Sequence, residues 1–261
     1  NNLQEIKNSL ESIFNQSYSK ILISIVIDGI VKEDIINYLN QFTNLNNFKI
    51  TQIPKNLGLA KVLNIAIKES KCEYIARMDA DDISIKDRIS KQVKFMDQNL
   101  DIDILGTSIY EKYGEKFLYS TLSQDNKKLL KWFSIQNPVF HPTVLFRATY
   151  FKKAGYYPSV RNTTEDSLMW LQAFIAGAKF SNLKDPLYII NIDDRLLKRR
   201  KSFESIINEF KVRIKINKAL KFGFHAYFFI IVKSLLLLCI PTLIIRLVYK
   251  LRAKISGILF I

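Results

Sequence analysis

The amino-acid sequence predicts an α/β fold with a mostly parallel central sheet and a helical C-terminal appendage. Segments with helical spacing of apolar residues alternate with short β-branched runs over residues 3–106. This alternation is typical of parallel strands joined by right-handed helical crossovers. Aspartates follow two of the predicted strands, at the sheet edge where ligands bind in such folds. The chain then becomes basic and apolar, so we expect an α/β domain at 1–197 and a helical tail at 198–261.

The predicted elements can be justified in order from the N-terminus. Leu3, Ile6 and Leu10 share one face of a helix at 3–14, and the β-branched run at 21–27 predicts a buried strand that ends at Asp28. The same two patterns predict helices at 31–45, 59–68, 88–98 and 165–176, and strands at 48–53, 74–78 and 102–106. The region with Asn137-Pro138 and His141-Pro142 is predicted to be less regular.

The tail contains an apolar segment at 224–248 that is interrupted by His225, Lys233, Pro241 and Arg246. Its longest charge-free stretch, 234–245, is shorter than the roughly 20 apolar residues that a membrane-spanning helix needs. The pattern therefore favours a helix that lies in the membrane interface or re-enters it. A helical hairpin packed on the α/β domain is the alternative, because a short apolar run can also be core.

The charge of the chain predicts an anionic partner. The formal net charge is +15, from 39 Lys and Arg against 24 Asp and Glu. Aromatic-basic motifs of RNA-binding proteins and zinc-finger spacings are absent from the sequence, so no nucleic-acid partner is expected. Much of the basic excess lies after Arg195, among long apolar runs. This arrangement favours an anionic membrane surface.

The N-terminal sequence and the cysteines bear on location. The chain opens with an amphipathic stretch, without a basic segment followed by an apolar one, which predicts no secretory signal. Cys72 and Cys239 are far apart and lie in compositionally different zones, so a disulfide framework is not expected. With the tail, these features predict a peripheral or monotopic protein on the cytoplasmic face of the cell membrane.

The acidic cluster Asp79-Ala80-Asp81-Asp82 is the strongest candidate for a metal site. It directly follows an apolar strand, which crowds carboxylates at one strand end. Carboxylate oxygens suit Mg²⁺ or Mn²⁺, and a nucleotide diphosphate would supply the remaining ligands. The alternative is that one acid caps the next helix while the others are solvated. An EF-hand loop is excluded, because Ile83 stands at a ligand position and the loop glycine is missing.

Other polar residues have both a functional and a structural interpretation. Gly58 precedes a predicted helix, where it could admit a ligand to the helix N-terminus or simply form a turn. Glu165 and Asp166 follow Thr164 at a predicted helix start, where a carboxylate can act as a general base or only stabilise the helix dipole. His141 lies beside apolar residues, so we expect it to be packed and hydrogen-bonded rather than to contact an acceptor or a metal.

Taken together and in order, several motifs of this chain resemble those of family-two glycosyltransferases. The N-terminal motifs are Ser12-Ile13-Phe14-Asn15-Gln16-Ser17, residues 25–29, Asn56-Leu57-Gly58-Leu59 and Ala76-Arg77-Met78-Asp79-Ala80-Asp81-Asp82. Further along, Asn137-Pro138, His141-Pro142-Thr143-Val144, Thr164-Glu165-Asp166 and Trp170 resemble bacterial capsule and exopolysaccharide enzymes of the amylovoran type. The resemblance extends from residue 3 to about residue 200.

This resemblance implies a GT-A (Rossmann-like) fold and an inverting transfer from a nucleotide-diphosphate sugar, with Mn²⁺ or Mg²⁺, to a lipid-linked or oligosaccharide acceptor. The implied donor-binding residues are Asp28 at the nucleobase, Asp79 at the ribose, Gly58 and Arg77, with Arg199 and Arg200 at the departing diphosphate. The implied metal ligands are Asp81 and Asp79. Asp166 is implied as the general base, with Glu165 beside it as the second catalytic candidate.

The chain departs from the family pattern at two places. Family members usually begin with a strand and a nucleotide-contacting loop before the helix that opens this sequence. We therefore expect either that the sequence is incomplete at its N-terminus or that another segment fills that sheet position. The second departure is milder, because Asp28 stands alone where many relatives have two aspartates.

Two other functions stay open on the sequence alone. A nucleotidyltransferase also uses carboxylates and metal beside a parallel sheet, although the Gly-rich basic loop usual near its start is absent here. The other alternative is a catalytically inactive, membrane-bound scaffold of a polysaccharide assembly complex, which donor hydrolysis would exclude. The donor sugar, the acceptor and the linkage are not encoded by any motif.

Overall fold

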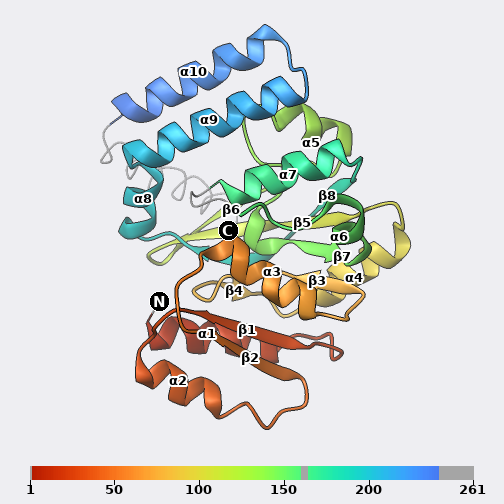
Figure 1. Ribbon diagram of the computed structural model, residues 1–261, viewed down its shortest axis with the longest axis vertical. Helices are drawn as coiled ribbons and strands as arrows, with labels where there is room; N and C mark the ends of the chain where they lie inside the picture. The colour runs from red at the N-terminus through yellow and green to blue at the C-terminus, as the bar shows by residue number, and fades with distance from the viewer. Residues whose placement is uncertain (1, 160–163, 241–261) are drawn as a thin grey trace.

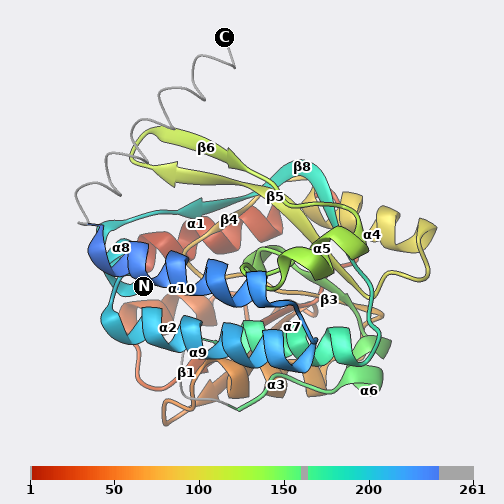
Figure 2. The same ribbon diagram turned by 90° about the horizontal axis from the view of Figure 1, so that it is seen from above.

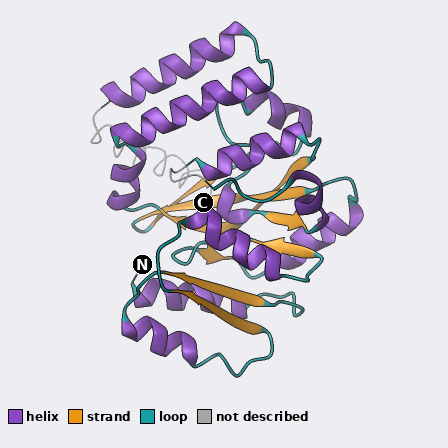
Figure 3. Ribbon diagram, in the orientation of Figure 1, coloured by secondary structure: helices purple, strands orange, loops and turns teal. Residues whose placement is uncertain are grey.

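The computed structural model describes residues 2–159 and 164–240, and the described strands form two separate sheets (Figure 1). A two-stranded sheet lies with two helices at the N-terminal end of the molecule, and a six-stranded sheet forms the centre. Two long helices from the C-terminal part lie side by side at the opposite end from the small sheet. The secondary structure of these layers is coloured in Figure 3.

The first part of the chain alternates helices and strands, as predicted, up to residue 76. Its elements are α1 (Leu3–Phe14), β1 (Ile23–Asp28), α2 (Glu33–Asn40), β2 (Phe48–Ile53), α3 (Leu59–Glu69), β3 (Tyr74–Ala76), β4 (Ile83–Ser84) and α4 (Arg88–Gln98). The short strand β4 was not predicted. Helix α1 begins with a capping box, in which Asn2 and Glu5 each satisfy a backbone amide of the other. Helix α2 is shorter than the predicted 31–45, because turns follow it from Gln41.

The second part contains more regular structure than the sequence predicted. Its elements are β5 (Ile104–Tyr113), β6 (Lys116–Ser120), α5 (Asn126–Trp132), the 3₁₀ helix η1 (His141–Thr143), β7 (Leu145–Arg147), α6 (Thr149–Ala154), α7 (Glu165–Ile175), β8 (Phe180–Asn191), α8 (Asp194–Arg200), α9 (Phe203–Ala219) and α10 (Phe224–Cys239). The central strand β8 was not predicted. Its run contains Pro186, which falls where the register to β5 shifts and so is tolerated at a bulge.

The prediction of a mostly parallel sheet was wrong, because the six-stranded sheet is mixed. Its order is β3-β7-β5-β8-β4, with β6 paired to β5. Only β5 and β8 pair in parallel within it, whereas β7, β6 and β4 run antiparallel to their neighbours. The regular helix-strand alternation that suggested parallel crossovers ends at β3, which is followed directly by β4. The hairpin β5–β6 and the short strand β7 then introduce antiparallel pairs.

The two sheets are not joined by hydrogen-bonded strands in the described part of the chain. Strand β1 pairs only with β2, in parallel, and β3 pairs only with β7. Residues of β1 and of β3 line one large cavity of about 1570 Å³. Among residues 2–159 and 164–240, no strand is hydrogen-bonded between β1 and β3.

Helix α9 is part of the main core. Val212 and Ile216 of α9 belong to the same buried cluster as Trp170 and Ala173 of α7. Helix α10 packs on α9 and is the outermost layer at the top of Figure 1, so that it lies nearest the viewer in Figure 2. No helix of the described residues is long and apolar enough to cross a membrane. Cys72 and Cys239 are both free, in agreement with the prediction that the chain has no disulfide framework.

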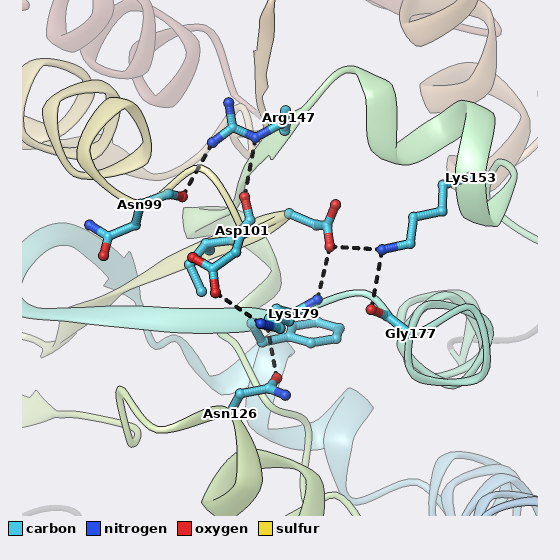
Figure 4. Close-up of polar contacts among 10 residues, drawn as sticks. Asn99, Asp101, Asn126, Arg147, Lys153, Gly177 and Lys179 are labelled. Carbon is cyan, nitrogen blue, oxygen red and sulfur yellow. Dashed lines mark hydrogen bonds and ion pairs between the residues drawn. The ribbon is translucent and has the colours of Figure 1, made fainter.

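A cluster of polar contacts lies at the amino ends of β5 and β8. At the start of β5, the Asp103 carboxylate accepts hydrogen bonds from the Lys179 amide at 2.9 Å and from Lys153 Nζ at 3.3 Å. Lys179 Nζ also pairs with Asp101 at 3.0 Å, and Arg147 donates to nearby backbone carbonyls, as Figure 4 shows. These contacts stabilise the amino ends of β5 and β8.

Candidate active site

The predicted site residues come from distant parts of the chain and line one cavity. Asp28 ends β1, the acidic cluster follows β3, and α7 begins with Glu165 and Asp166. The end of α8 contributes two arginines to the same cavity. Its predicted lining residues are Asp28, Arg77, Asp79, Asp81, Glu165, Asp166, Arg199 and Arg200. Gly58 is not among the lining residues, but its neighbour Leu59 is.

The carboxylate of Asp28 organises the loop before α3. Its two oxygens accept hydrogen bonds from the Leu57 amide at 2.7 Å and from the Gly58 amide at 2.9 Å. Gly58 has φ +88°, a conformation that residues with a side chain rarely adopt, so glycine is required there for this turn. Asp28 therefore lines the cavity and also holds the turn at Gly58 from which α3 begins. Contact of Asp28 with a nucleobase stays a prediction.

Asp79 forms an ion pair with Arg77, whose side chain is only 7% exposed. Burial acts to lower the pKa of Arg77, but the field of Asp79 and other nearby groups offsets this effect, so that the pKa is raised. Arg77 Nε and Nη1 are buried without a hydrogen-bond partner among the described residues. Such a charged donor against a cavity is suited to an oxygen-rich ligand.

The two other aspartates of the cluster differ in environment. Asp82 is buried and accepts a hydrogen bond from the Asn191 amide at 3.3 Å. Burial, together with the charges of Asp79 and Asp81, raises the pKa of Asp82 to about 7. The pKa of Asp81 is raised mainly by burial and then by Asp79. Three carboxylates in this position repel one another, which is the electrostatic setting that a cation relieves.

The residues fit a metal site only if a ligand completes the coordination. No group of three or more His, Cys, Asp or Glu side chains that could hold a metal occurs among residues 2–159 and 164–240. Asp79 is engaged with Arg77, whereas the Asp81 carboxylate has no hydrogen bond to another side chain within the same ranges. Asp81 is thus the better placed ligand of the two predicted ones. A cation held by one or two carboxylates takes its other ligands from phosphates and water.

Asp166 is held in a buried hydrogen-bond network at the start of α7. One carboxylate oxygen accepts from Asn137 Nδ2 at 2.8 Å, and the other accepts from the Ser167 amide at 2.6 Å. Burial raises the pKa of Asp166, and the Ser167 amide lowers it by a smaller amount. One Asp166 oxygen accepts from a first-turn amide of α7, so the same carboxylate stabilises the helix start and can take a catalytic role. A fixed, buried carboxylate of raised pKa is suited to accept a proton.

Sequence reasoning missed some residues that shape this site. Asn137 was noted only as part of a motif, yet it binds Asp166 directly. Arg213 lies in the predicted tail and reaches Asn137 at 2.6 Å, a contact that no sequence spacing could reveal. His141 was expected to be packed and hydrogen-bonded, and this is confirmed. Its ring contacts Tyr157 Oη at 2.8 Å and packs edge-on against Trp170, and its burial lowers its pKa well below the usual range.

Comparisons with known proteins identify relatives of this chain. Residues 1–155 match the family model described as Glycosyl transferase family 2. The amylovoran biosynthesis glycosyltransferase AmsE of Erwinia amylovora is 28% identical over 216 residues, which cover 82% of this chain and 80% of the relative. A UDP-Gal:alpha-D-GlcNAc-diphosphoundecaprenol beta-1,3-galactosyltransferase of Escherichia coli is 24% identical over 248 residues, which cover 94% of this chain and 90% of the relative.

A solved structure has a similar fold. The mannosyltransferase PcManGT of Pyrobaculum calidifontis, in complex with GDP-Man and Mn²⁺, aligns with a TM-score of 0.59 at 12% sequence identity. The alignment covers 99% of this chain and 84% of that protein. The mixed α/β architecture is thus similar to that of GT-A glycosyltransferases. The matched family model spans more than half of the 261 residues, and the chain therefore belongs to glycosyl transferase family 2.

Proposed function

We propose that this protein is a metal-dependent, inverting glycosyltransferase that uses a nucleotide-diphosphate sugar. The observation that carries the proposal is the single cavity in which Asp166, fixed by Asn137 and Ser167, lies together with the acidic cluster after β3. Family membership supports glycosyl transfer over the nucleotidyltransferase alternative. An inactive scaffold is the other alternative, and measurement of donor hydrolysis and sugar transfer distinguishes it from an enzyme.

The reaction assigns a role to Asp166 as the general base. The acceptor hydroxyl gives its proton to the Asp166 carboxylate while its oxygen attacks the anomeric carbon from the face opposite the diphosphate. A new glycosidic C–O bond forms, and the C–O bond to the diphosphate breaks with its electron pair on the leaving oxygen. Glu165 is the neighbouring candidate, and burial raises its pKa as well.

The leaving diphosphate needs positive charge. Arg199 and Arg200 end α8 with exposed side chains on the cavity, where they are suited to bind the diphosphate. Asp81, with Asp79 beside it, would hold Mn²⁺ or Mg²⁺, which supplies Lewis-acid stabilisation of the diphosphate when it is bound. The Mn²⁺ in the GDP-Man complex of the Pyrobaculum mannosyltransferase supports the use of a divalent cation.

The relatives support a role in cell-surface polysaccharide synthesis. One is named for amylovoran biosynthesis, and another for transfer of galactose to a sugar on diphosphoundecaprenol. We therefore infer a lipid-linked or oligosaccharide glycan as the acceptor. A lipid-linked acceptor cannot leave the bilayer, so the enzyme would work at the membrane surface.

The exposed face of α10 supports association with the cytoplasmic face of an anionic membrane. Its exposed apolar side chains are Phe224, Phe228, Phe229, Ile231, Leu235, Leu236 and Leu238. Such a row suits the acyl boundary of a bilayer. Basic side chains of the tail are expected to meet the lipid head groups. Lys233 is not one of them, because its Nζ donates to the Ile135 carbonyl at 2.8 Å. The other expected contacts, Arg246, Lys250, Arg252 and Lys254, lie outside the described residues.

The test combines donor binding with transfer. Calorimetry with UDP, GDP and dTDP, each with Mn²⁺ or with a chelator, should find one nucleotide whose binding needs the cation. The matching sugar nucleotides are then assayed with GlcNAc-diphosphoundecaprenol, the acceptor type named for the Escherichia coli relative, and with other lipid-linked sugars. Formation of a glycosidic product with inverted anomeric configuration supports the proposal. Cation-independent binding would refute the metal site, and donor binding without hydrolysis or transfer to any acceptor would favour the scaffold.

A further inference from the structure

Helix α9 places a buried cation beside the proposed catalytic base. The Arg213 side chain is 3% exposed, and its guanidinium group donates in three directions. Nε pairs with Glu209 at 2.7 Å, Nη1 donates to the Phe133 carbonyl at 2.9 Å, and Nη2 donates to Asn137 Oδ1 at 2.6 Å. The group also lies over the Phe133 ring, 5.5 Å from its centroid. These contacts hold Arg213 in a single orientation.

The contact with Arg213 determines which way the Asn137 amide faces. A guanidinium group only donates hydrogen bonds, so the atom of Asn137 that meets it must be the oxygen. The same oxygen also accepts from Ser167 Oγ at 2.9 Å. The amide nitrogen is then directed to Asp166 Oδ2, at 2.8 Å. If the amide were reversed, its NH₂ group would face the guanidinium group, which can only donate, and Asp166 would lose a hydrogen bond.

We propose that Arg213 is a positioning residue that orients the Asp166 carboxylate through the side-chain amide of Asn137. This inference rests on the proposed function, in which Asp166 is the base. It also places α9, which the sequence assigned to a separate tail, in the catalytic unit. Arg213 does not touch the acceptor in this mechanism. Through Asn137 it fixes the direction from which one oxygen of Asp166 accepts a hydrogen bond. The carboxylate is thereby held in one orientation, in which its remaining lone pairs can accept the proton of the acceptor hydroxyl.

The charges around Asp166 agree with this role. Burial raises the pKa of Asp166, as does the charge of Glu209, whereas Arg213 and Arg77 lower it. Glu165 precedes Asp166 in α7, and Lys233 of α10 lies 3.8 Å from Glu209. Loss of the Arg213 charge removes a group that lowers the pKa and leaves Glu209 with the weaker Lys233 contact. The acid limb of the activity should therefore move to higher pH.

The test compares variants of the full chain at two linked positions. Arg213→Met removes both the positive charge and the hydrogen bond to Asn137. Arg213→Lys keeps the charge but lacks the planar guanidinium group that donates to Asn137 and Phe133 at the same time. Lys215→Met, an exposed position on the same helix, is the control. We expect Arg213→Met to lower kcat about 10- to 100-fold with donor affinity unchanged. The acid limb of its pH–rate profile should move to higher pH. In Arg213→Lys the acid limb should stay near the pH of the parent, although kcat falls.

A double-variant cycle separates positioning from general stability. Because Arg213 acts through Asn137, the combination of Arg213→Met with Asn137→Ala should be no slower than Asn137→Ala alone. Additive losses in kcat, parent-like kcat in Arg213→Met, or an equal loss of donor affinity would overturn the inference. Melting curves check that each variant folds.

A further variant decides the matter if the Arg213 variants do not fold. Ser167→Ala removes only the hydroxyl donor to Asn137 Oδ1 and keeps the backbone amide from which Asp166 accepts. Its kcat should therefore fall less than that of Asn137→Ala, because Arg213 still orients the Asn137 amide. Loss as large as in Asn137→Ala would show that Ser167, and not Arg213, sets the orientation. Asp166→Asn separates the two proposals. If it transfers sugar like the parent, the base assignment fails, and if it is inactive while Arg213→Met is fully active, only the Arg213 inference fails.

Discussion

Asp166→Asn should abolish transfer while preserving the fold and donor binding. The side chains are nearly equal in size, but the amide cannot accept a proton from the acceptor hydroxyl. General-base catalysis by a positioned carboxylate contributes roughly 10²- to 10⁴-fold, so the loss in kcat should lie in this range. The Michaelis constant for the donor should change little, because Asp166 contacts the acceptor side of the reaction in this mechanism.

The cost in stability can be worked out from the contacts of Asp166. Its two oxygens accept from two donors, Asn137 Nδ2 and the Ser167 amide. An amide has one oxygen, so either rotamer of the variant turns its NH₂ group toward one of these donors. The loss of one such hydrogen bond costs about 1 kcal/mol. Removal of a buried charge acts in the opposite direction, so the melting temperature should change by only a few degrees.

The assay uses the neighbouring acid as a matched control. Glu165→Gln removes a carboxylate from the same helical turn, and should keep transfer within a few-fold of the parent. Donor binding is measured by calorimetry, and transfer by product formation over a range of pH. Since burial raises the pKa of Asp166, the acid limb of kcat/KM in the parent should lie above the usual range of an aspartate. Transfer by Asp166→Asn within a few-fold of the parent would refute the assignment, and inactivity of Glu165→Gln alone would move the base to Glu165.

Three further predictions concern the metal site, the acidic cluster and α10. Asp81→Asn should remove the cation dependence of nucleotide binding together with most of the affinity, as measured by calorimetry, and binding that still needs Mn²⁺ would contradict its role as ligand. Asp82 has a folded-state pKa of about 7 against an ordinary 3.8, so the stability that it contributes is present below pH 4 and is lost as the pH rises through 7. In a chelating buffer, Asp82→Asn should therefore be more stable than the parent above pH 7, by at most ~4 kcal/mol, and similar to it at pH 4, while an equal difference at both values would contradict this. Substitution of Phe228 and Leu235 by Gln should reduce flotation of the protein with anionic liposomes. Binding of the parent to these liposomes should weaken as the salt concentration rises. The control is Leu100→Gln, at an exposed apolar position in another part of the chain.

The sequence predicted the first half of the molecule well, because its elements are set by local patterns. Helix α1 and strand β2 have the predicted bounds, since their apolar residues repeat with the period of one regular element. The placement of Asp28 and of the acidic cluster at strand ends follows from the same patterns. The predicted aspartates at these positions line one cavity in the structure. The family resemblance also came from residues that are close together in the sequence and could be read in order.

The tertiary structure alone decided the sheet and the surroundings of Asp166. The pairing of β7 with both β3 and β5 makes the sheet mixed, and so short a strand carries no periodicity in the sequence. Asp166 is joined to Asn137 over 29 positions, and Asn137 to Arg213 over 76. Hydrogen bonds between residues so far apart depend on how helices pack, and no local propensity encodes that packing. Folding therefore brings the buried guanidinium group of Arg213 to the site, although the sequence of this segment indicated only a basic helix.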